Sequence, residues 1–483
     1  MTTIGRYLKN TAFITFTIIL RQVLAIIFTL VAANKLGAAG FGIYSAALGF
    51  VLLVGESFDF GLSSLLIREL SRHRGEEGYY YRNYLGIKLL LAIPAYLIIV
   101  FTGRIVGFSA ETVSLIPILA IFAFLVGFEK FNTCFFYAIE RMEFDTIIQT
   151  ARHACTLLFV VLVLFSGLGL VPFAWAVVAG GSAGFLAGIT IIRRYISHIR
   201  PERHASFWKN IGREVWPFGT AALLIATYQR IGIVILSTLV SDAEVGYYSV
   251  GYSIMGALLI VSVALTGSLN PIISRLTVTD RKKSLIVYRS GFKFLLLTGL
   301  PIATCGSILS TPIIKLLFSP EYLPASSSLI WFLWATPVIY IKSLADTTLN
   351  ALNRQRIWLL STAISAGINI GLNYLLIPRF SHVGAAMAFL FAQFIGFLIV
   401  YRAIKSVLGG VKFVDTFIRP ILPMLLVTTM VWFIRNFNLA LVITSAVVIY
   451  FLLCWYAGAL GETEKELVIS AVREWRKKKK EKN

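Results

Sequence analysis

The chain has 483 residues, of which 58% are hydrophobic and only 14% charged, and its mean hydropathy is +0.81. A soluble globular domain carries about 25% charged residues, so this composition excludes a soluble enzyme or binding module. The net charge of +21 suggests nucleic-acid binding at first, but the basic residues lie in short segments between apolar runs. That distribution is typical of a protein that crosses the membrane many times, and it excludes nucleic acid as the partner.

Apolar runs follow one another along the whole chain. A membrane helix needs roughly 20 mostly apolar residues, and this criterion gives about fourteen candidates. They begin near Thr11, Ile43, Tyr84, Thr112, Thr150, Pro172, Trp216, Gly246, Gly291, Ser326, Ile357, His382, Pro420 and Asn438. We therefore expect an all-α polytopic membrane protein with about fourteen transmembrane helices.

Lysine and arginine are distributed unequally between alternate loops. Five of them lie in odd-numbered loops, whereas 33 lie at the two termini and in even-numbered loops. Because basic residues are retained on the cytoplasmic side, this pattern predicts a multi-pass protein of the plasma (inner) membrane with both termini in the cytoplasm.

Two parts of the chain repeat each other. Four residues recur at a constant offset of 204, namely Ala39, Gly42, Tyr44 and Ser45 as Ala243, Gly246, Tyr248 and Ser249. Later matches have offsets of 207 and 213, as small loop insertions would produce. An even number of spans in each repeat predicts two six-helix bundles related by a pseudo-two-fold axis along the membrane normal, with a cavity between them. The predicted regions are a bundle at 1–205, a bundle at 206–408, an extra helix pair at 409–460 and a basic cytoplasmic tail at 461–483.

Short motifs within this frame resemble a known family. The segments 36–45 and 58–69 and the Ala351-Leu352-Asn353-Arg354 sequence are similar to those of the polysaccharide biosynthesis (O-antigen) flippases. That family belongs to the multidrug/oligosaccharidyl-lipid/polysaccharide exporter superfamily. The resemblance implies a flippase for an oligosaccharide carried on a polyprenyl phosphate or pyrophosphate.

Arginines inside the predicted spans are candidates for binding such a carrier. Arg21 lies in the middle of the first span and Arg230 in the middle of the seventh, which is its counterpart in the repeat. A charge at a helix centre costs about 2.5–3.5 kcal/mol on insertion scales, so it usually faces a cavity or a partner. Guanidinium groups bind phosphate bidentately, and we expect both arginines to hold the carrier's phosphate groups. Arg152 and Lys342, nearer the ends of their spans, are weaker candidates for the same role.

Four further polar residues are candidates for counter-ions or for a coupling-ion site. Glu56 and Asp59 share one helix face and could pair with Arg21, or could form part of a site for Na⁺ or H⁺. Asn369 and Asn373 also share a face; interhelical hydrogen bonding is the favoured interpretation of this amide pair. The resemblance implies that relatives which carry lipid-linked precursors have a sodium site in their C-terminal half, normally with carboxylate ligands. In the C-terminal half of this chain only amides are found at the corresponding place.

Two other functions remain open at this point. A cation-coupled multidrug antiporter would use the same fold, but a pump for cationic drugs is expected to line its cavity with carboxylates. A membrane glycosyltransferase or polysaccharide polymerase needs acidic residues in large outer loops, and the predicted outer loops of this chain are short.

The chain contains no Gly-x-x-x-x-Gly-Lys-Ser/Thr loop, so we expect no nucleotide hydrolysis. With the short outer loops, this leads us to expect that the protein is not an enzyme. We expect no cofactor or metal site; the partners are membrane lipid, the lipid-linked oligosaccharide and, as a further candidate class, glycan assembly enzymes.

Overall fold

The computed structural model describes residues 3–196, 199–411 and 418–459, and these residues form helices without a single strand. The all-α fold is therefore confirmed, while the predicted tail at 461–483 lies outside the described residues. The helices are α1 (Thr3–Asp59), α2 (Leu62–Arg72), α3 (Glu77–Ile105), α4 (Ala110–Ala138), α5 (Met142–Phe165), α6 (Leu170–Ile192), α7 (Ala205–Glu214), α8 (Trp216–Leu239), α9 (Asp242–Leu258), α10 (Ile260–Thr279), α11 (Arg281–Leu317), the 3₁₀ turn η1 (Pro320–Tyr322), α12 (Ala325–Ala351), α13 (Gln355–Val407), α14 (Arg419–Ile434) and α15 (Leu439–Tyr456).

Two helices are far longer than one membrane crossing, because each contains a sharp reversal. Helix α1 has 57 residues and is interrupted at Gly37, whose φ of 71° is in the left-handed region that glycine adopts without strain. Helix α13 has 53 residues and is interrupted at Ser381, with a φ of 49°. Each of these helices is therefore long enough for two spans.

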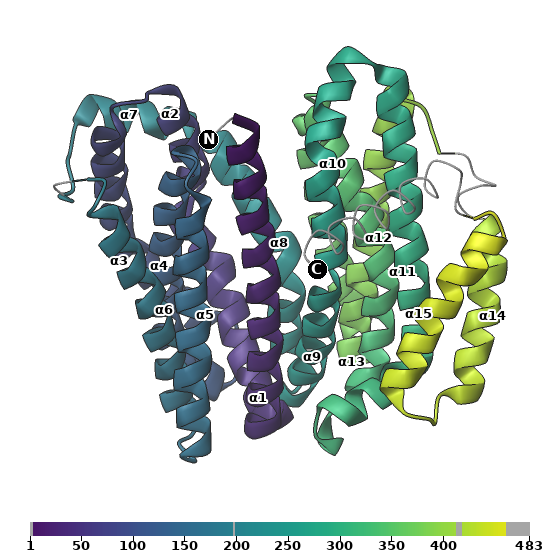
Figure 1. Ribbon diagram of the computed structural model, residues 1–483. Coiled ribbons are helices and arrows are strands. Elements are labelled where there is room, and N and C mark those ends of the chain that lie inside the picture. Colours follow the sequence, from purple (N-terminus) through teal and green to yellow (C-terminus); the bar gives the residue numbers. More distant parts are fainter. Residues whose placement is uncertain (1–2, 197–198, 412–417, 460–483) are drawn as a thin grey trace, which may run out of the picture. The chain divides into compact units, whose positions relative to one another are not determined.

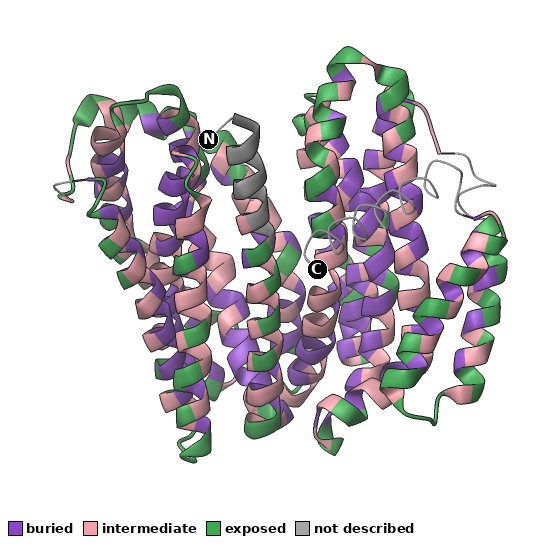
Figure 2. Cartoon of the chain, in the orientation of Figure 1, coloured by how far each residue is buried: buried purple, intermediate pink, exposed green. Residues whose placement is uncertain are grey.

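Length and hydropathy identify 11 helices in the described part of the chain that can cross a membrane, and α14 is a shorter apolar helix. The expected polytopic membrane protein is confirmed, and the count of fourteen spans remains a prediction. Exposed residues recur along the helices (Figure 2). On α3 they form an apolar stripe, in which Leu90, Ile93, Leu97 and Phe101 are 62%, 71%, 59% and 67% exposed. Exposed apolar area of this extent is typical of a surface covered by lipid.

The chain divides into two compact units. The first comprises Met1–Ile260, Leu317–Ser328 and Thr362–Ala392, and the second comprises Val261–Leu316, Leu329–Ser361 and Gln393–Asn483. In the second unit, the extra pair α14 and α15 packs on α11 through an apolar cluster that includes Leu297, Val427 and Tyr450. The predicted boundaries at residues 205, 408 and 460 remain predictions.

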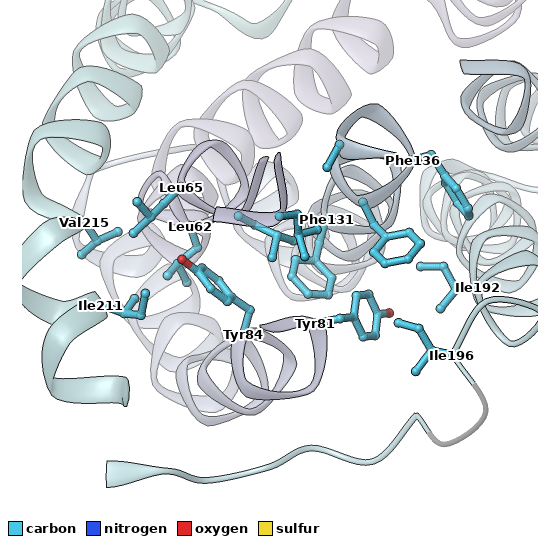
Figure 3. Packing of buried hydrophobic residues seen from close by; sticks show 14 of the residues in the cluster. Leu62, Leu65, Tyr81, Tyr84, Phe131, Phe136, Ile192, Ile196, Ile211 and Val215 are labelled. Carbon is cyan, nitrogen blue, oxygen red and sulfur yellow. The ribbon is translucent and has the colours of Figure 1, made fainter. Parts of the chain in front are cut away.

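The short helices α2 and α7 close one end of the first unit. With 11 and 10 residues they cannot span a bilayer, and Figure 1 shows them at the end where the N-terminus lies. Their apolar sides bury Leu65 and Ile211 in a cluster with Tyr81, Tyr84 and Phe131 from α3 and α4 (Figure 3). Hydropathy along the sequence did not predict either helix, because each is amphipathic and short.

The repeated segments cross each other at equivalent glycines. A Cβ atom placed on Gly42 of α1 would lie 1.8 Å from the carbonyl oxygen of Asp242, and one on Gly246 of α9 would lie 2.1 Å from the carbonyl oxygen of Ala38. Positions 38 and 242 differ by the same 204 residues as 42 and 246. The contact is reciprocal, as a local two-fold axis between the two segments requires. Glycine is needed at both positions because the main chains touch.

Candidate functional site

A cavity of about 180 Å³ lies among α1, α8 and α9 in the first unit. Its polar lining consists of Thr29, Tyr44, Ser45, Gln229, Arg230, Tyr248, Ser249, Tyr252 and Ser253. The repeat supplies matching parts of this lining, because Tyr44-Ser45 and Tyr248-Ser249 are equivalent at the offset of 204. The Tyr248 and Tyr252 rings stack, with centroids 6.2 Å apart and planes inclined by 11°. The sequence repeat had identified Tyr44, Ser45, Tyr248 and Ser249, but nothing in it assigned them to a cavity.

Arg230 is the basic group of this cavity. Its side chain is half-buried, and the described residues offer it neither a hydrogen bond nor an ion pair. The groups that act on it electrostatically are Glu56, Tyr44 and Tyr252. A guanidinium with free N–H donors in a polar cavity can accept an anionic group from a ligand.

Arg21 lies elsewhere on α1 and is exposed. One turn before it, the Thr17 hydroxyl shares a 2.6 Å hydrogen bond with that of Thr146 on α5. Its charge acts on Asp145 and Tyr137, yet among the described residues no carboxylate is within ion-pair distance. The structure thus leaves both arginines available for a ligand, and their role remains a prediction.

The two arginines differ in depth along their helices. Arg21 precedes Ala38 by 17 residues, whereas Arg230 precedes the equivalent Asp242 by 12. Five residues of α-helix correspond to about 8 Å along the axis. The two arginines therefore differ in their position along the helix axis, counted from the equivalent residues Ala38 and Asp242.

Arg152 and Lys342 have carboxylate partners. The Nε atom of Arg152 lies 2.9 Å from Glu129, and its side chain also donates to Gln149 over 2.8 Å. In the second unit, Nζ of Lys342 lies 2.8 Å from Asp346, one turn along α12. Either cation would have to leave its partner in order to bind a phosphate, so the contacts favour structural roles for both.

Glu56 and Asp59 also have partners, but not the expected one. We expected Arg21, and the structure instead places Lys130 beside Glu56 at 2.8 Å and Lys88 beside Asp59 at 2.7 Å. Lys88 is fully buried and also donates to the carbonyl oxygen of Gly127. The expected pairing with Arg21 was wrong because the neighbouring helices α3 and α4 carry lysines at this level of the bundle.

Replacing Lys88 with methionine is expected to destabilise the protein by about 3–5 kcal/mol, because it leaves the Asp59 carboxylate buried without its main partner. Adding Asp59→Leu should restore much of that loss, since an apolar pair of similar size carries no desolvation penalty. Lys130→Met removes a second cation, 44% exposed, that lies 3.2 Å from the same carboxylate, and it should cost less. Thermal unfolding of the purified protein measures all three; a Lys88→Met variant as stable as wild type would argue against a structural ion pair.

The amide pair on α13 is buried. Nδ2 of Asn373 donates to Oδ1 of Asn369 over 2.7 Å, and Oδ1 of Asn373 has no hydrogen-bond partner among the described residues. Asn373 lies close to Gly232 of α8, two residues after Arg230. The part of the chain that the structure describes contains no group of three or more His, Cys, Asp or Glu side chains able to hold a metal. A coupling role for this pair remains a prediction.

Sequence reasoning also missed a polar network beside Arg21. The Tyr137 hydroxyl donates to Asp145 over 2.8 Å, and Gln149 lies 3.4 Å from the other oxygen of that carboxylate. These residues come from the end of α4 and the first turns of α5, where sequence position alone suggested a helix boundary. The four-residue spacing of Asp145 and Gln149 is the signal that could have found the pair.

A multi-span helical protein in which two repeated segments enclose a cavity with an unpaired arginine has the architecture of a membrane transporter. The sequence model described as "Polysaccharide biosynthesis protein" matches residues 7–277, more than half of the chain. The chain therefore belongs to the polysaccharide biosynthesis protein family. A second model, described as MatE, matches residues 217–375.

Known proteins and structures are similar to this chain over most of its length. An uncharacterized membrane protein of Methanocaldococcus jannaschii is 22% identical over 391 residues, which are 75% of this chain and 77% of that protein. The inward closed conformation of the lipid II flippase MurJ superimposes with a TM-score of 0.78 at 15% identity, covering 95% of this chain and 100% of MurJ. An inward-facing multidrug transporter of the MATE family has a TM-score of 0.65 at 13% identity, covering 80% of this chain and 94% of that one. At these identities the structural matches establish the fold.

Proposed function

We propose that this protein is a flippase that moves an oligosaccharide linked to a polyprenyl phosphate or pyrophosphate from the cytoplasmic to the outer leaflet, for assembly of a cell-surface polysaccharide or glycan. The observation that carries the proposal is the unpaired Arg230 in the cavity among α1, α8 and α9. Membership of the polysaccharide biosynthesis protein family supports the same substrate class.

The lining of the cavity suits the head of such a lipid. The guanidinium can form two parallel hydrogen bonds to a phosphate, and it stays charged at every physiological pH. Tyrosine rings offer an apolar face and a hydroxyl, and the serines add small polar groups beside them. The polyprenyl tail would remain in the lipid while the head group enters the cavity. No group that performs covalent chemistry is required for this step.

The direction of transport follows from the predicted orientation. The excess of basic residues at the termini and in even-numbered loops supports cytoplasmic termini in a plasma (inner) membrane. Alternating access then takes the head group in from the cytoplasm and releases it outside. The reversal at Gly37 and the Gly42–Gly246 crossing would lie toward the outer side. These contacts would close that side in the state seen here.

A cation-coupled multidrug antiporter is the second candidate, because the MatE model matches residues 217–375. Such a protein would bind organic cations in the cavity. The positive charge of Arg230 opposes this, and the carboxylate that acts on it, Glu56, is already paired with Lys130. The flippase is therefore the better-supported function.

Proteoliposomes that contain the full-length protein test the proposal. A fluorescent polyprenyl-pyrophosphate oligosaccharide in the inner leaflet should reach the outer leaflet, where a membrane-impermeant quencher detects it, faster than in protein-free vesicles. A fluorescent organic cation in parallel vesicles tests the alternative. Movement of the cation without movement of the lipid-linked saccharide would favour the antiporter and contradict the flippase.

A further inference from the structure

A buried histidine lies at the reversal in α13. His382 directly follows Ser381, the residue with a φ of 49°, and is 7% exposed. Its ring contacts Glu244 in the first turn of α9 on one side, and Pro324 and the first turn of α12 on the other. All of these residues belong to the first unit. The histidine therefore joins three segments that are distant in the sequence.

The Nε2 atom of His382 faces a carbonyl oxygen and a hydroxyl group. It lies 3.1 Å from the carbonyl oxygen of Pro324 and 3.1 Å from Oγ of Ser327. The Ser327 hydroxyl donates its hydrogen to that same carbonyl oxygen over 2.7 Å. In that arrangement Ser327 accepts from the ring, and the carbonyl oxygen of Pro324 can only accept. Both contacts are therefore satisfied when Nε2 carries a hydrogen.

The Nδ1 atom of His382 contacts Oε2 of Glu244, which also accepts a hydrogen bond from the Ser381 hydroxyl. An imidazole with its single hydrogen on Nε2 would present a lone pair to this carboxylate. The contact therefore needs one more proton, either on the ring or on the carboxyl group. Tyr247, whose ring lies 5.5 Å away at 68° to the imidazole, is a further titratable group that faces His382. Tyr247 in turn interacts electrostatically with Glu321.

We propose that His382 and Glu244 form a proton-binding site that holds the start of α9 to the segment before α12 and to the reversal of α13. Separated from each other, a histidine and a glutamate lose their protons near pH 6.5 and about pH 4.3. Above about pH 6.5 the cluster therefore has to take up one proton when it forms, and below about pH 4.3 it has to release one. The stabilisation is thus fully present between these two values and is lost as the pH rises above the window.

The site lies near the contacts that hold the Gly37 reversal. The Tyr322 hydroxyl, in η1 just before Pro324, donates to the carbonyl oxygen of Ala33 over 3.1 Å, and its ring packs edge-on against Tyr247. The backbone N–H of Ala38 donates to Glu321 over 3.0 Å. Protons on the predicted outer side would therefore favour the arrangement in which this side is closed. This inference adds a pH response to the proposed flippase, and it needs no transported lipid.

Thermal unfolding of the purified full-length protein between pH 6 and pH 8.5 tests the site. The wild type is expected to lose more thermal stability over this range than His382→Gln, by about 2 °C or more in Tm. Glu244→Gln, which leaves the ring in place, should reduce the pH dependence in the same way. His204→Gln is the matched control, because His204 is exposed and its Nδ1 lies 3.9 Å from Glu202; it should keep the wild-type pH dependence.

Retention of the full pH-dependent loss of Tm by both His382→Gln and Glu244→Gln would overturn the proton site. If His382→Gln does not accumulate in the membrane, the comparison with Glu244→Gln decides alone. Neither result bears on lipid transport, so failure of this site and failure of the flippase proposal are distinguishable.

Discussion

Arg230→Ala is expected to lower the rate of lipid-linked saccharide transport by about 10- to 100-fold while the protein still inserts and folds. A hydrogen bond to a charged group contributes about 1.5–3 kcal/mol, and the alanine variant loses both the charge and the paired donors. Arg230→Lys should fall in between, because lysine keeps the charge but cannot bind a phosphate bidentately. The proteoliposome assay measures the rate, and size-exclusion chromatography of the detergent-solubilised protein shows whether each variant is folded.

Arg21→Ala should reduce transport to a similar extent, since Arg21 has no ion-pair partner to lose in the described part of the protein. The control is Arg104→Ala, because Arg104 is an exposed arginine in the last turn of α3, whereas Arg21 lies in the middle of its predicted span. Its transport rate should equal that of the wild type.

A wild-type rate in Arg230→Ala would remove Arg230 from the binding site. The substrate assignment would then depend on the family relationship alone.

Gly42→Ala is expected to abolish most transport, although alanine normally stabilises a helix by about 1 kcal/mol relative to glycine. The added Cβ would overlap the carbonyl oxygen of Asp242, at 1.8 Å, so the two main chains must separate. The predicted outer side of the cavity, which the crossing of Gly42 and Gly246 is proposed to close, would then close incompletely. Gly246→Ala should have the same effect, because its Cβ would lie 2.1 Å from the carbonyl oxygen of Ala38.

The control for this experiment is Gly55→Ala in the same helix, where the new Cβ would lie 3.5 Å from the Cβ of Ala123, an ordinary contact. Gly55→Ala should transport normally. A cysteine at Ser45, in the cavity, should react faster with a membrane-impermeant thiol reagent from outside in the Gly42→Ala background than with Gly42 present. Normal transport and unchanged reactivity in Gly42→Ala would contradict a closing role for this crossing.

Partners of the charged residues could not be predicted from the sequence. Spacing along a helix identifies residues on the same face, which is why the shared faces of Glu56 with Asp59 and of Asn369 with Asn373 were predictable. It does not identify the residue on the next helix. Lys88 follows its partner Asp59 by 29 residues, and only the packing of α3 against α1 makes Lys88 the partner instead of Arg21.

The sequence alone determined that the protein is a helical membrane protein, because this depends on hydropathy over about 20 residues. It also determined the repeat, which depends only on residue identity at a fixed offset. Tertiary structure alone decided which polar groups remain unpaired. It satisfied Arg152, Lys342, Glu56 and Asp59 with partners and left Arg230 open in a cavity. The physical reason is that a charge in an apolar medium is stabilised by whichever opposite charge the packed helices bring within a few ångströms, and sequence distance does not limit that choice.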